Sequence, residues 1–310
     1  MTSTDWTTEL PRAMTEATQH LKNGDVVSAF NIIGNGMTDI WANAYAQGQV
    51  GRAIATVREH ELFTIAHQDP YSERAFTKPR GYAGDAVMMD YVYRGVPAAG
   101  TTDLGKTVFT GTTRGSMGLS VLFRRQLLTA CINEVASNRA DFNILSVASG
   151  HCREIEGSLL ANPALAKAGR LVAFDQDEES CKTVKRDYAA YPVDVVCASV
   201  RKLLAGDESF LGKFDLIYSA GLFDYLTDPV AKKLVSVMAA MLKPGGKLLV
   251  GNFAPSSSGR GYMELFLDWN LIYRDAAELR RLFGSEREVS TTSFLDPHSN
   301  VFYAEWRCPK

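Results

Sequence analysis

From Asp141 onward, short apolar runs alternate with helical stretches, and this alternation constrains the fold more than any other feature of the sequence. The apolar runs lie at Ile144–Ala148, Leu171–Phe174, Val193–Cys197, Leu216–Tyr218 and Lys247–Gly251. The stretches with helical spacing between them are Arg153–Ala161, Glu178–Ala190 and Pro229–Leu242. Uninterrupted apolar strands that alternate with helices indicate a parallel sheet covered on both faces.

The C-terminal tail follows a different pattern. Glu286–Phe294 and Val301–Arg307 read as two consecutive strands joined by a proline-containing loop, Asp296–Asn300. A mostly parallel sheet that ends in an antiparallel hairpin is one variant of the doubly wound Rossmann plan. We therefore expect an α/β fold with a Rossmann-like sheet in residues 139–310.

The first part of the chain is predicted to be helical. Thr7–His20, Asp25–Gln47 and Gly51–Gln68 carry apolar residues at helical spacing. The segment Asp69–Gly111 is richer in proline, glycine and aromatic residues, and a long helix is expected from Met117 to Asn138. We expect residues 1–138 to form an N-terminal helical lid domain.

Charge and composition exclude several classes of protein. The formal net charge of the 310 residues is −2 and no stretch concentrates Lys or Arg, which argues against nucleic acid and anionic membranes as partners. The N-terminus lacks the pattern of a secretory signal, and no apolar run is long enough to span a membrane. The five cysteines show no C-x-x-C pairing, so we expect buried, reduced thiols and no metal site. We expect a cytoplasmic enzyme that acts on a small-molecule acceptor, and a homodimer is a further expectation.

The first predicted strand leads into a turn of small residues, Ala148, Ser149 and Gly150. Small residues at this place let the backbone approach a ligand closely, and amide groups after the turn face the crevice. A dinucleotide fingerprint would need G-x-G-x-x-G, so an NAD-dependent oxidoreductase is a poor fit. The methyltransferase pattern is G-x-G-x-G, and here Ala148 and Cys152 stand in place of the outer glycines. His151 follows the turn, either as a ligand contact or as an exposed residue.

An acidic residue ends the second predicted strand. Asp175 is 25 residues beyond Gly150, at the place where a carboxylate grips a ribose diol in nucleoside-binding sheets. Such a charge-assisted hydrogen bond contributes roughly 1.5–3 kcal/mol. The alternative is that Asp175 or Asp177 caps the following helix. Ser199 and Val200, at the end of the third strand, are expected to flank the adenine.

Two further segments complete an ordered set of landmarks. Phe214–Leu226 reads as a strand with an early Asp and a small-residue loop at its end, and Leu242–Phe253 places a Pro-Gly-Gly turn before another strand. This order resembles that of class I S-adenosylmethionine-dependent methyltransferases, and residues 140–310 resemble their seven-stranded fold. More narrowly, Lys78–Asp85, Tyr218–Leu226 and Met263–Arg274 resemble a bacterial family that makes 3-hydroxypalmitic acid methyl ester, a quorum-sensing signal of plant pathogens.

The resemblance implies S-adenosyl-L-methionine as the cofactor and assigns roles by position. The cofactor would be held by residues of the strand ends, namely Ala148, Ser149, Gly150, Asp175, Gln176, Ser199, Val200, Ser219 and Gly221. Tyr218 and Asp224 lie where these enzymes place catalytic residues, and Tyr225 lies where they place substrate contacts. The family's substrate does not transfer with the fold, because its members are diverse.

Two segments outside these strands are also candidates. Arg80 and Tyr82 flank Gly81 in the segment Arg80–Asp85, which we expect to fold over the cofactor as a lid, with interdomain packing as the alternative. Trp269, Tyr273 and Arg274 fall in one predicted helical stretch, where the two aromatic rings would share a face and line an acceptor pocket, or belong to the core.

The expected chemistry is transfer of a sulfonium methyl group to a small, apolar acid. A carboxylate acceptor is ionised at neutral pH and needs no general base, which fits the lack of a Ser/His/Asp or Cys/His constellation. A hydroxyl, amine or carbon acceptor would need a base, for which His151, Tyr218 and Asp224 are the candidates. A C- or N-methyltransferase of a natural-product intermediate and a non-enzymatic S-adenosylmethionine sensor are the alternatives.

Overall fold

The computed structural model describes residues 5–138, 141–162, 169–206 and 212–310, which form two compact units. A helical unit comprises Met1–Val121 with Ser256–Asn270, and a sheet unit comprises Leu122–Pro255 with Leu271–Lys310. The units therefore differ in their bounds from the expected domains 1–138 and 139–310. The segment Ser256–Asn270 leaves the sheet unit and returns to it, because its short helix is buried among the N-terminal helices.

The sheet unit is built on seven strands in the order β3-β2-β1-β4-β5-β7-β6. Strands β1 to β5 run parallel, and β7 and β6 pair antiparallel at one edge. Their bounds are β1 Asn143–Val147, β2 Arg170–Asp175, β3 Val193–Cys197, β4 Phe214–Ser219, β5 Leu242–Phe253, β6 Thr292–Leu295 and β7 Val301–Arg307. The prediction of a Rossmann-like sheet with an antiparallel C-terminal hairpin is confirmed.

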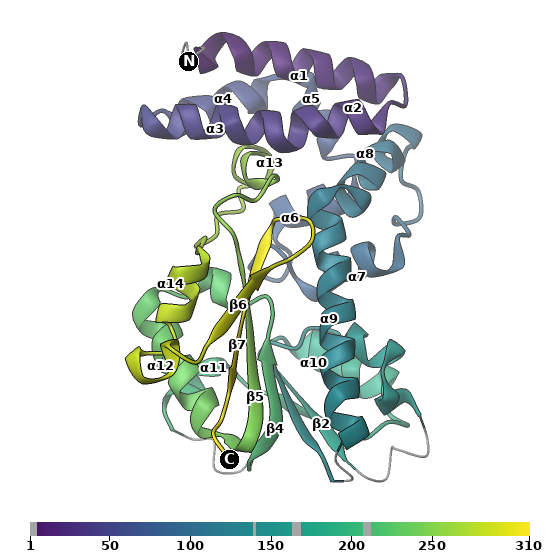
Figure 1. Cartoon of the computed structure of the whole chain (residues 1–310). Helices are drawn as coiled ribbons and strands as arrows, with labels where there is room; N and C mark the ends of the chain where they lie inside the picture. Colours follow the sequence, from purple (N-terminus) through teal and green to yellow (C-terminus); the bar gives the residue numbers. More distant parts are fainter. Residues whose placement is uncertain (1–4, 139–140, 163–168, 207–211) are drawn as a thin grey trace. The chain divides into compact units, whose positions relative to one another are not determined.

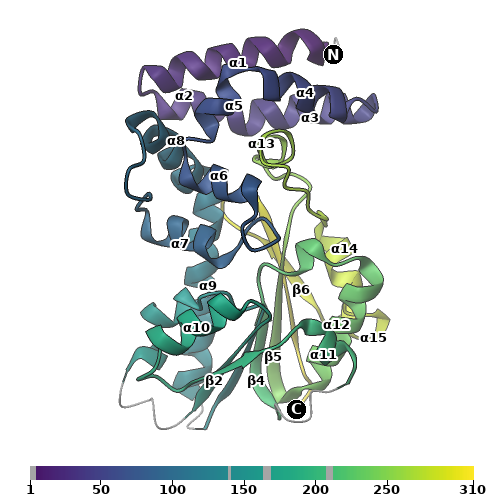
Figure 2. The ribbon, with the colours of Figure 1, turned by 180° about the vertical axis from the view of Figure 1, so that it is seen from behind.

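Helices cover both faces of this sheet (Figures 1 and 2). One face carries α10 (Glu178–Asp187) and the part of α9 (Ser116–Asn138) that belongs to the sheet unit. The other carries α11 (Val200–Leu204), α12 (Asp228–Ala240) and α14 (Ala276–Arg281), with the short α15 (Ser285–Glu288) beyond them. Leucines, valines and phenylalanines of β1, β2, β4 and β5 form one continuous apolar core with α11, α12 and α14. This burial drives the packing of the unit.

The helical unit consists of short helices packed around one another. Its elements are α1 Trp6–Lys22, α2 Val26–Asn31, a π-helical turn η1 Ile32–Gly36, α3 Met37–Ala46, α4 Val50–Glu59, α5 Glu61–Ala66, α6 Pro70–Thr77, α7 Ala86–Arg94, α8 Asp103–Arg114 and α13 Arg260–Phe266. Helix α13 is wholly buried against α3, α4 and η1 (Figure 1). A Cβ on Gly261 would lie 2.2 Å from the backbone of Met37, so only glycine permits this close approach.

The predicted local structure is wrong at three places in the second half of the chain. Arg153–Ala161 forms two 3-10 turns, η2 (Arg153–Gly157) and η3 (Leu159–Ala161), because Gly157 favours the helix weakly and a proline follows Asn162. Thr292 begins β6, and the residues before it form α15 rather than a strand. The residues from Trp269 to Arg274 lie in no helix or strand, because α13 ends at Phe266 and α14 begins at Ala276.

Among the described residues, no helix is long and apolar enough to cross a membrane. The same residues contain no group of three or more His, Cys, Asp and Glu side chains that is arranged to hold a metal ion. All five cysteines are free thiols, and three of them are buried. Cys197 differs from the expectation because its side chain is exposed at the end of β3.

Candidate active site

The turn after β1 has an unusual backbone. Ala148, Gly150 and Cys152 have φ angles of 54°, 54° and 50°, in the left-handed region that favours glycine. The two outer residues are those that stand where the methyltransferase pattern has glycine, so the loop keeps a glycine-type conformation without the glycines. A residue with a Cβ pays roughly 1–2 kcal/mol for this conformation. Strain of this kind is often found at ligand-binding loops.

Asp175 ties this turn to the end of β2. Its Oδ2 accepts a hydrogen bond from the Gly150 amide at 2.7 Å, and its Oδ1 accepts one from the Asp177 amide at 2.9 Å. Burial raises the pKa of Asp175, although these hydrogen bonds act in the opposite direction. The cap of α10 is Asp177, whose side chain accepts from the amides of Glu179 and Ser180. The helix-capping alternative therefore applies to Asp177.

The end of β3 lies beside Asp175. Cys197 is the register partner of Asp175 in the parallel ladder, and the Ala198 amide donates to the Asp175 carbonyl at 2.8 Å. Ser199 caps the short helix α11, which begins at Val200. These residues, with the exposed Gln176, are thus brought to one edge of the sheet with the β1 turn. In open α/β sheets, ligands bind at this carboxyl edge, where the strand order reverses.

The end of β4 carries two further predicted cofactor residues. The Ser219 hydroxyl is buried and has no hydrogen-bond partner within the described parts of the chain. Gly221 lies in the loop that follows, where a Cβ would approach Nη1 of Arg124 to 3.4 Å. The Arg124 guanidinium donates to the Ala220 carbonyl at 2.8 Å. A buried hydroxyl, a glycine-containing loop and a cation therefore meet at this edge.

Asp224 sits in the 3-10 turn η4 (Phe223–Tyr225) that follows β4. Its Oδ1 accepts from the Phe253 amide at 2.6 Å, and its carbonyl accepts from the Ile272 amide at 2.7 Å. Burial raises the pKa of Asp224 to about 6, and the charges of Arg124 and Arg274 act against that rise. A carboxylate with such a pKa can accept a proton near neutral pH.

Tyr218 does not have the environment of a general base. Its hydroxyl donates to Oε1 of Glu154 at 2.6 Å in the buried layer between the sheet and α9. Burial raises the pKa of Tyr218 well above its ordinary value, and the carboxylate of Glu154 raises it further. The phenolate is therefore strongly disfavoured, which argues against Tyr218 as a general base. Burial also raises the pKa of Glu154.

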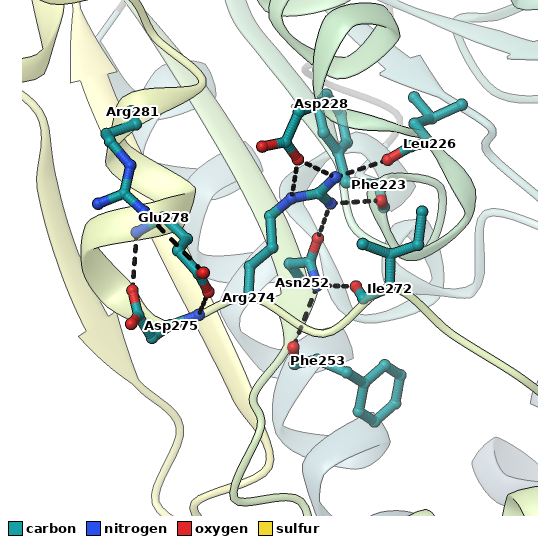
Figure 3. Close-up of polar contacts among 10 residues, drawn as sticks. All are labelled: Phe223, Leu226, Asp228, Asn252, Phe253, Ile272, Arg274, Asp275, Glu278 and Arg281. Atoms are coloured by element: carbon teal, nitrogen blue, oxygen red, sulfur yellow. Dashed lines mark hydrogen bonds and ion pairs between the residues drawn. The ribbon is translucent and has the colours of Figure 1, made fainter. Parts of the chain in front are cut away.

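The predicted substrate residues separate in the structure. Arg274 is 2% exposed, and its guanidinium donates five hydrogen bonds to Asp228, Asn252 and the carbonyls of Phe223 and Leu226 (Figure 3). A guanidinium has five N–H donors, so the side chain has none left for a substrate, and the substrate assignment of Arg274 is wrong. Tyr225 is 39% exposed beside Asp224.

The two aromatic candidates do not share a helical face, because the chain is not helical there. Trp269 is buried in the helical unit, where its amide donates to the Met263 carbonyl at 2.9 Å. Tyr273 is half-buried and belongs to the sheet unit. His151 is 6% exposed, which excludes the alternative of an exposed residue after the turn.

Arg80 and Tyr82 are half-buried in the loop between α6 and α7 of the helical unit. The loop begins at Lys78, which caps α6 in the left-handed conformation, and ends at Asp85, which caps α7. Asp85 is buried and forms an ion pair of 2.6 Å with Arg74, so its carboxylate has a structural partner. The lid role of Arg80 and Tyr82 stays a prediction.

Sequence reasoning missed Arg124, Glu154 and Asn252. Arg124 stands in a helix between Phe123 and the polar Arg125 and Gln126, so the face of the helix that points to the site could not be assigned in advance. Glu154 was placed in a predicted amphipathic helix that does not form. Asn252 ends an apolar strand, where the single polar residue was a usable signal.

The fold and the site define a class of protein: a Rossmann-like α/β protein whose ligand edge is formed by the ends of β1, β2, β3 and β4. Residues 144–246, which contain this edge, match the family model described as a methyltransferase domain. The protein is an S-adenosylmethionine-dependent methyltransferase, and S-adenosylmethionine is its cofactor.

Solved structures agree with the fold. A protein of Bordetella parapertussis described as a possible exported protein is 17% identical, with a TM-score of 0.58 over 98% of this chain and 97% of its own. A proposed methyltransferase from Thermobifida fusca is 15% identical, with a TM-score of 0.52 over 72% of this chain and 94% of its own. At these identities the likeness concerns the fold alone. No curated protein sequence matches the chain.

Proposed function

We propose that the enzyme methylates the carboxyl oxygen of a small, apolar acid, such as a fatty-acid-like or secondary-metabolite acceptor. The observation that supports this proposal is the cationic character of α9 beside the ends of β1 and β4. Arg124 donates to the Ala220 carbonyl, and the charges of Arg124 and Arg125 act on the buried Glu154. A guanidinium is suited to a planar carboxylate because it offers paired donors.

The residues of the sheet edge fit the cofactor. We assign Ala148, Ser149 and Gly150 to the methionine side and Asp175 with Gln176 to the ribose. Ser199 and Val200 are assigned to the adenine, and Ser219 and Gly221 to the loop beside the sulfur. The glycine-type backbone of the first turn and the orphaned Ser219 hydroxyl support this assignment.

In this mechanism the protein mainly aligns the acceptor with the cofactor and removes water from both. When bound, S-adenosylmethionine supplies an electrophilic methyl group on a sulfonium. The arginines of α9 would hold and orient the acceptor carboxylate for its reaction with this methyl group. Orientation of this kind can remove roughly 7–11 kcal/mol from the barrier of a bimolecular reaction. The acceptor gives up no proton, since a carboxylate is already ionised at neutral pH.

A second candidate function is favoured by the pKa of Asp224. With a pKa of about 6, this carboxylate could take the proton of a hydroxyl, amine or carbon acceptor. His151 is a further candidate base because it is buried directly after the β1 turn. The C- and N-methyltransferase alternatives belong to this second candidate.

The experiment is a transfer assay with methyl-labelled S-adenosylmethionine over matched acids, alcohols and amines, including 3-hydroxypalmitic acid. We expect label in a base-labile ester of an acid, and a rate that declines only at the low pH where the acceptor acid itself protonates. A decline centred near pH 6 that is abolished in Asp224→Asn would favour the second candidate. Binding of S-adenosylhomocysteine without transfer to any acceptor would favour the sensor.

Arg124 provides the sharper test of the acid acceptor. Arg124→Gln should raise the KM of an acid acceptor at least tenfold, because a desolvated charged hydrogen bond is worth roughly 1.5–3 kcal/mol. Arg186→Gln is the matched control, since its side chain is 73% exposed on α10. Equal KM values in both variants would contradict the carboxylate role. Cytoplasmic location, a homodimer and a part in secondary metabolism stay predictions.

A further inference from the structure

The five N–H donors of the Arg274 guanidinium all donate to groups of the protein, and these groups lie around Asp224. Nε and Nη2 donate to Oδ1 of Asp228 at 3.0 and 2.8 Å, and Nη2 also donates to the Leu226 carbonyl at 2.6 Å. Nη1 donates to the Phe223 carbonyl at 2.8 Å and to Oδ1 of Asn252 at 2.7 Å (Figure 3). The Arg274 clamp, defined as Arg274 with these four partners, joins the end of β5 to the turn η4 and the start of α12.

Asn252 extends the clamp to the returning chain. Its Nδ2 donates to the Phe253 carbonyl at 3.0 Å and to the Ile272 carbonyl at 2.8 Å. The Arg274 amide donates to the same Phe253 carbonyl at 3.0 Å. Phe253 and Ile272 are the two residues whose amides donate to Asp224. The clamp therefore fixes both groups that hold Asp224.

The two charged residues of the clamp differ in their exposure to solvent, so the clamp has an electrostatic effect in addition to its packing. Arg274 is 2% exposed, whereas the side chain of Asp228 is 62% exposed, so the countercharge is partly screened by solvent while the cation is not. The positive charge of Arg274 accordingly reaches Asp224 and opposes the rise of its pKa. Other charges that bear on Asp224 come from Arg124 on α9.

We propose that Arg274 is a positioning residue, which fixes the place of Asp224 through the turn η4 and the end of β5. Its catalytic consequence rests on the second candidate function, in which Asp224 takes the proton of the acceptor, whereas the place and the pKa of Asp224 are measured without an acceptor. The residue touches neither cofactor nor acceptor in this role. It holds in place the loop that carries Asp224 and Tyr225.

The first measurement follows Asp224 by carbon-13 NMR of aspartate-labelled enzyme saturated with S-adenosylhomocysteine. In Arg274→Gln the cation is removed, so the pKa of Asp224 should rise from its wild-type value. In Arg274→Lys the charge is kept but the five-donor fork is lost, so the pKa should move less. Hydrogen exchange of the Phe253 and Ile272 amides should accelerate at least ~10-fold in both variants, because the opening of this loop becomes easier.

Two substitutions of Asp228 disturb the clamp less and can be used if the Arg274 variants fail to fold. Asp228→Ala removes the acceptor of two of the five hydrogen bonds, and we expect faster exchange of the Phe253 and Ile272 amides. Asp228→Asn keeps an oxygen acceptor and should leave this exchange within about twofold of wild type. The affinity for S-adenosylhomocysteine should stay unchanged in both variants.

Several outcomes would overturn the proposal. An Asp224 pKa that is the same in Arg274→Gln and wild type removes the electrostatic part, and unchanged amide exchange in Asp228→Ala removes the positioning part. A lower melting temperature without either change would leave a purely structural residue. If these measurements agree but no acid acceptor is methylated, the proposed function fails while the clamp stands.

Discussion

The Gly150 amide donates to Oδ2 of Asp175 at 2.7 Å, so the turn after β1 and the end of β2 are joined by a direct hydrogen bond. The carboxylate thereby lies at the carboxyl edge of the sheet, held also by the Asp177 amide. One carboxylate thus organises the loop and faces the region where a ribose would bind.

Asp175→Asn should weaken binding of S-adenosylhomocysteine about 10- to 100-fold, as expected for loss of a charge-assisted hydrogen bond. Asp177→Asn is the control because it removes a carboxylate two residues away but keeps an oxygen for capping α10. Calorimetry measures both variants. Because the pKa of Asp175 is raised, wild-type affinity should decline as pH falls through that pKa, and the decline should be missing in Asp175→Asn. Equal affinities of the two variants would refute the ribose assignment.

Ala148→Gly should raise the free energy of unfolding by between zero and ~1 kcal/mol, because glycine adopts a φ of 54° without strain. The same substitution at Ala55, exposed within α4, should cost about 1 kcal/mol through lost helix propensity. Urea denaturation compares the two. A loss at Ala148 as large as that at Ala55 would show that the loop stores no strain.

Tyr218→Phe should lower the free energy of unfolding by roughly 1–3 kcal/mol, because it leaves the buried Glu154 carboxyl without its hydrogen bond from the phenol. Glu154→Gln keeps an acceptor for that hydroxyl and should cost less. Denaturant titrations at neutral pH compare the two variants. A larger loss of unfolding free energy in Glu154→Gln than in Tyr218→Phe would contradict the prediction.

The Tyr218–Glu154 pair should also make the free energy of unfolding depend on pH. Because the pKa of Glu154 is raised in the folded protein, the folded chain binds this proton more tightly than the unfolded chain. The free energy of unfolding therefore falls as pH rises from the ordinary pKa of Glu154 to its raised value. Glu154→Gln lacks this titration, so its stability relative to wild type should increase across that window. A difference that is constant with pH would show that Glu154 does not titrate there.

Cys197 should react with iodoacetamide long before Cys181. Cys197 is exposed, whereas burial and the neighbouring Cys197 thiol raise the pKa of Cys181 to about 12, and the thiolate is the reacting species. Peptide mass spectrometry after brief labelling at pH 8 locates the modified thiol. S-adenosylhomocysteine should slow labelling of Cys197, since this residue pairs with Asp175. If S-adenosylhomocysteine does not slow the labelling of Cys197, the adenosine binds elsewhere.

The sheet was predictable because its strands are buried on both faces. Continuous apolar runs such as Leu171–Phe174 have no other stable environment in a protein of this composition. The order of Gly150, Asp175 and the loop after β4 then followed from chain order alone. Parallel strands bring their carboxyl ends to one edge, so the residues just beyond them meet.

The details that depend on tertiary contacts were not predictable. Arg274 looked like a substrate residue because a cation in an aromatic segment has no evident partner in sequence, yet its partners come from three other elements. Ala148 and Cys152 looked like lost glycines, whereas the loop imposes the glycine conformation on them. Tyr218 acquired a buried partner, Glu154, from a segment whose helix does not form.

The excursion of Ser256–Asn270 into the helical unit has a consequence for how the protein can be dissected. A truncation that starts at Leu122 would keep α13 but remove the helices that bury it, including the Met37 backbone against which Gly261 packs. The two units are interleaved in sequence, so neither can be cut out at a single bond. A division of this protein into exchangeable modules must therefore recombine four segments rather than two.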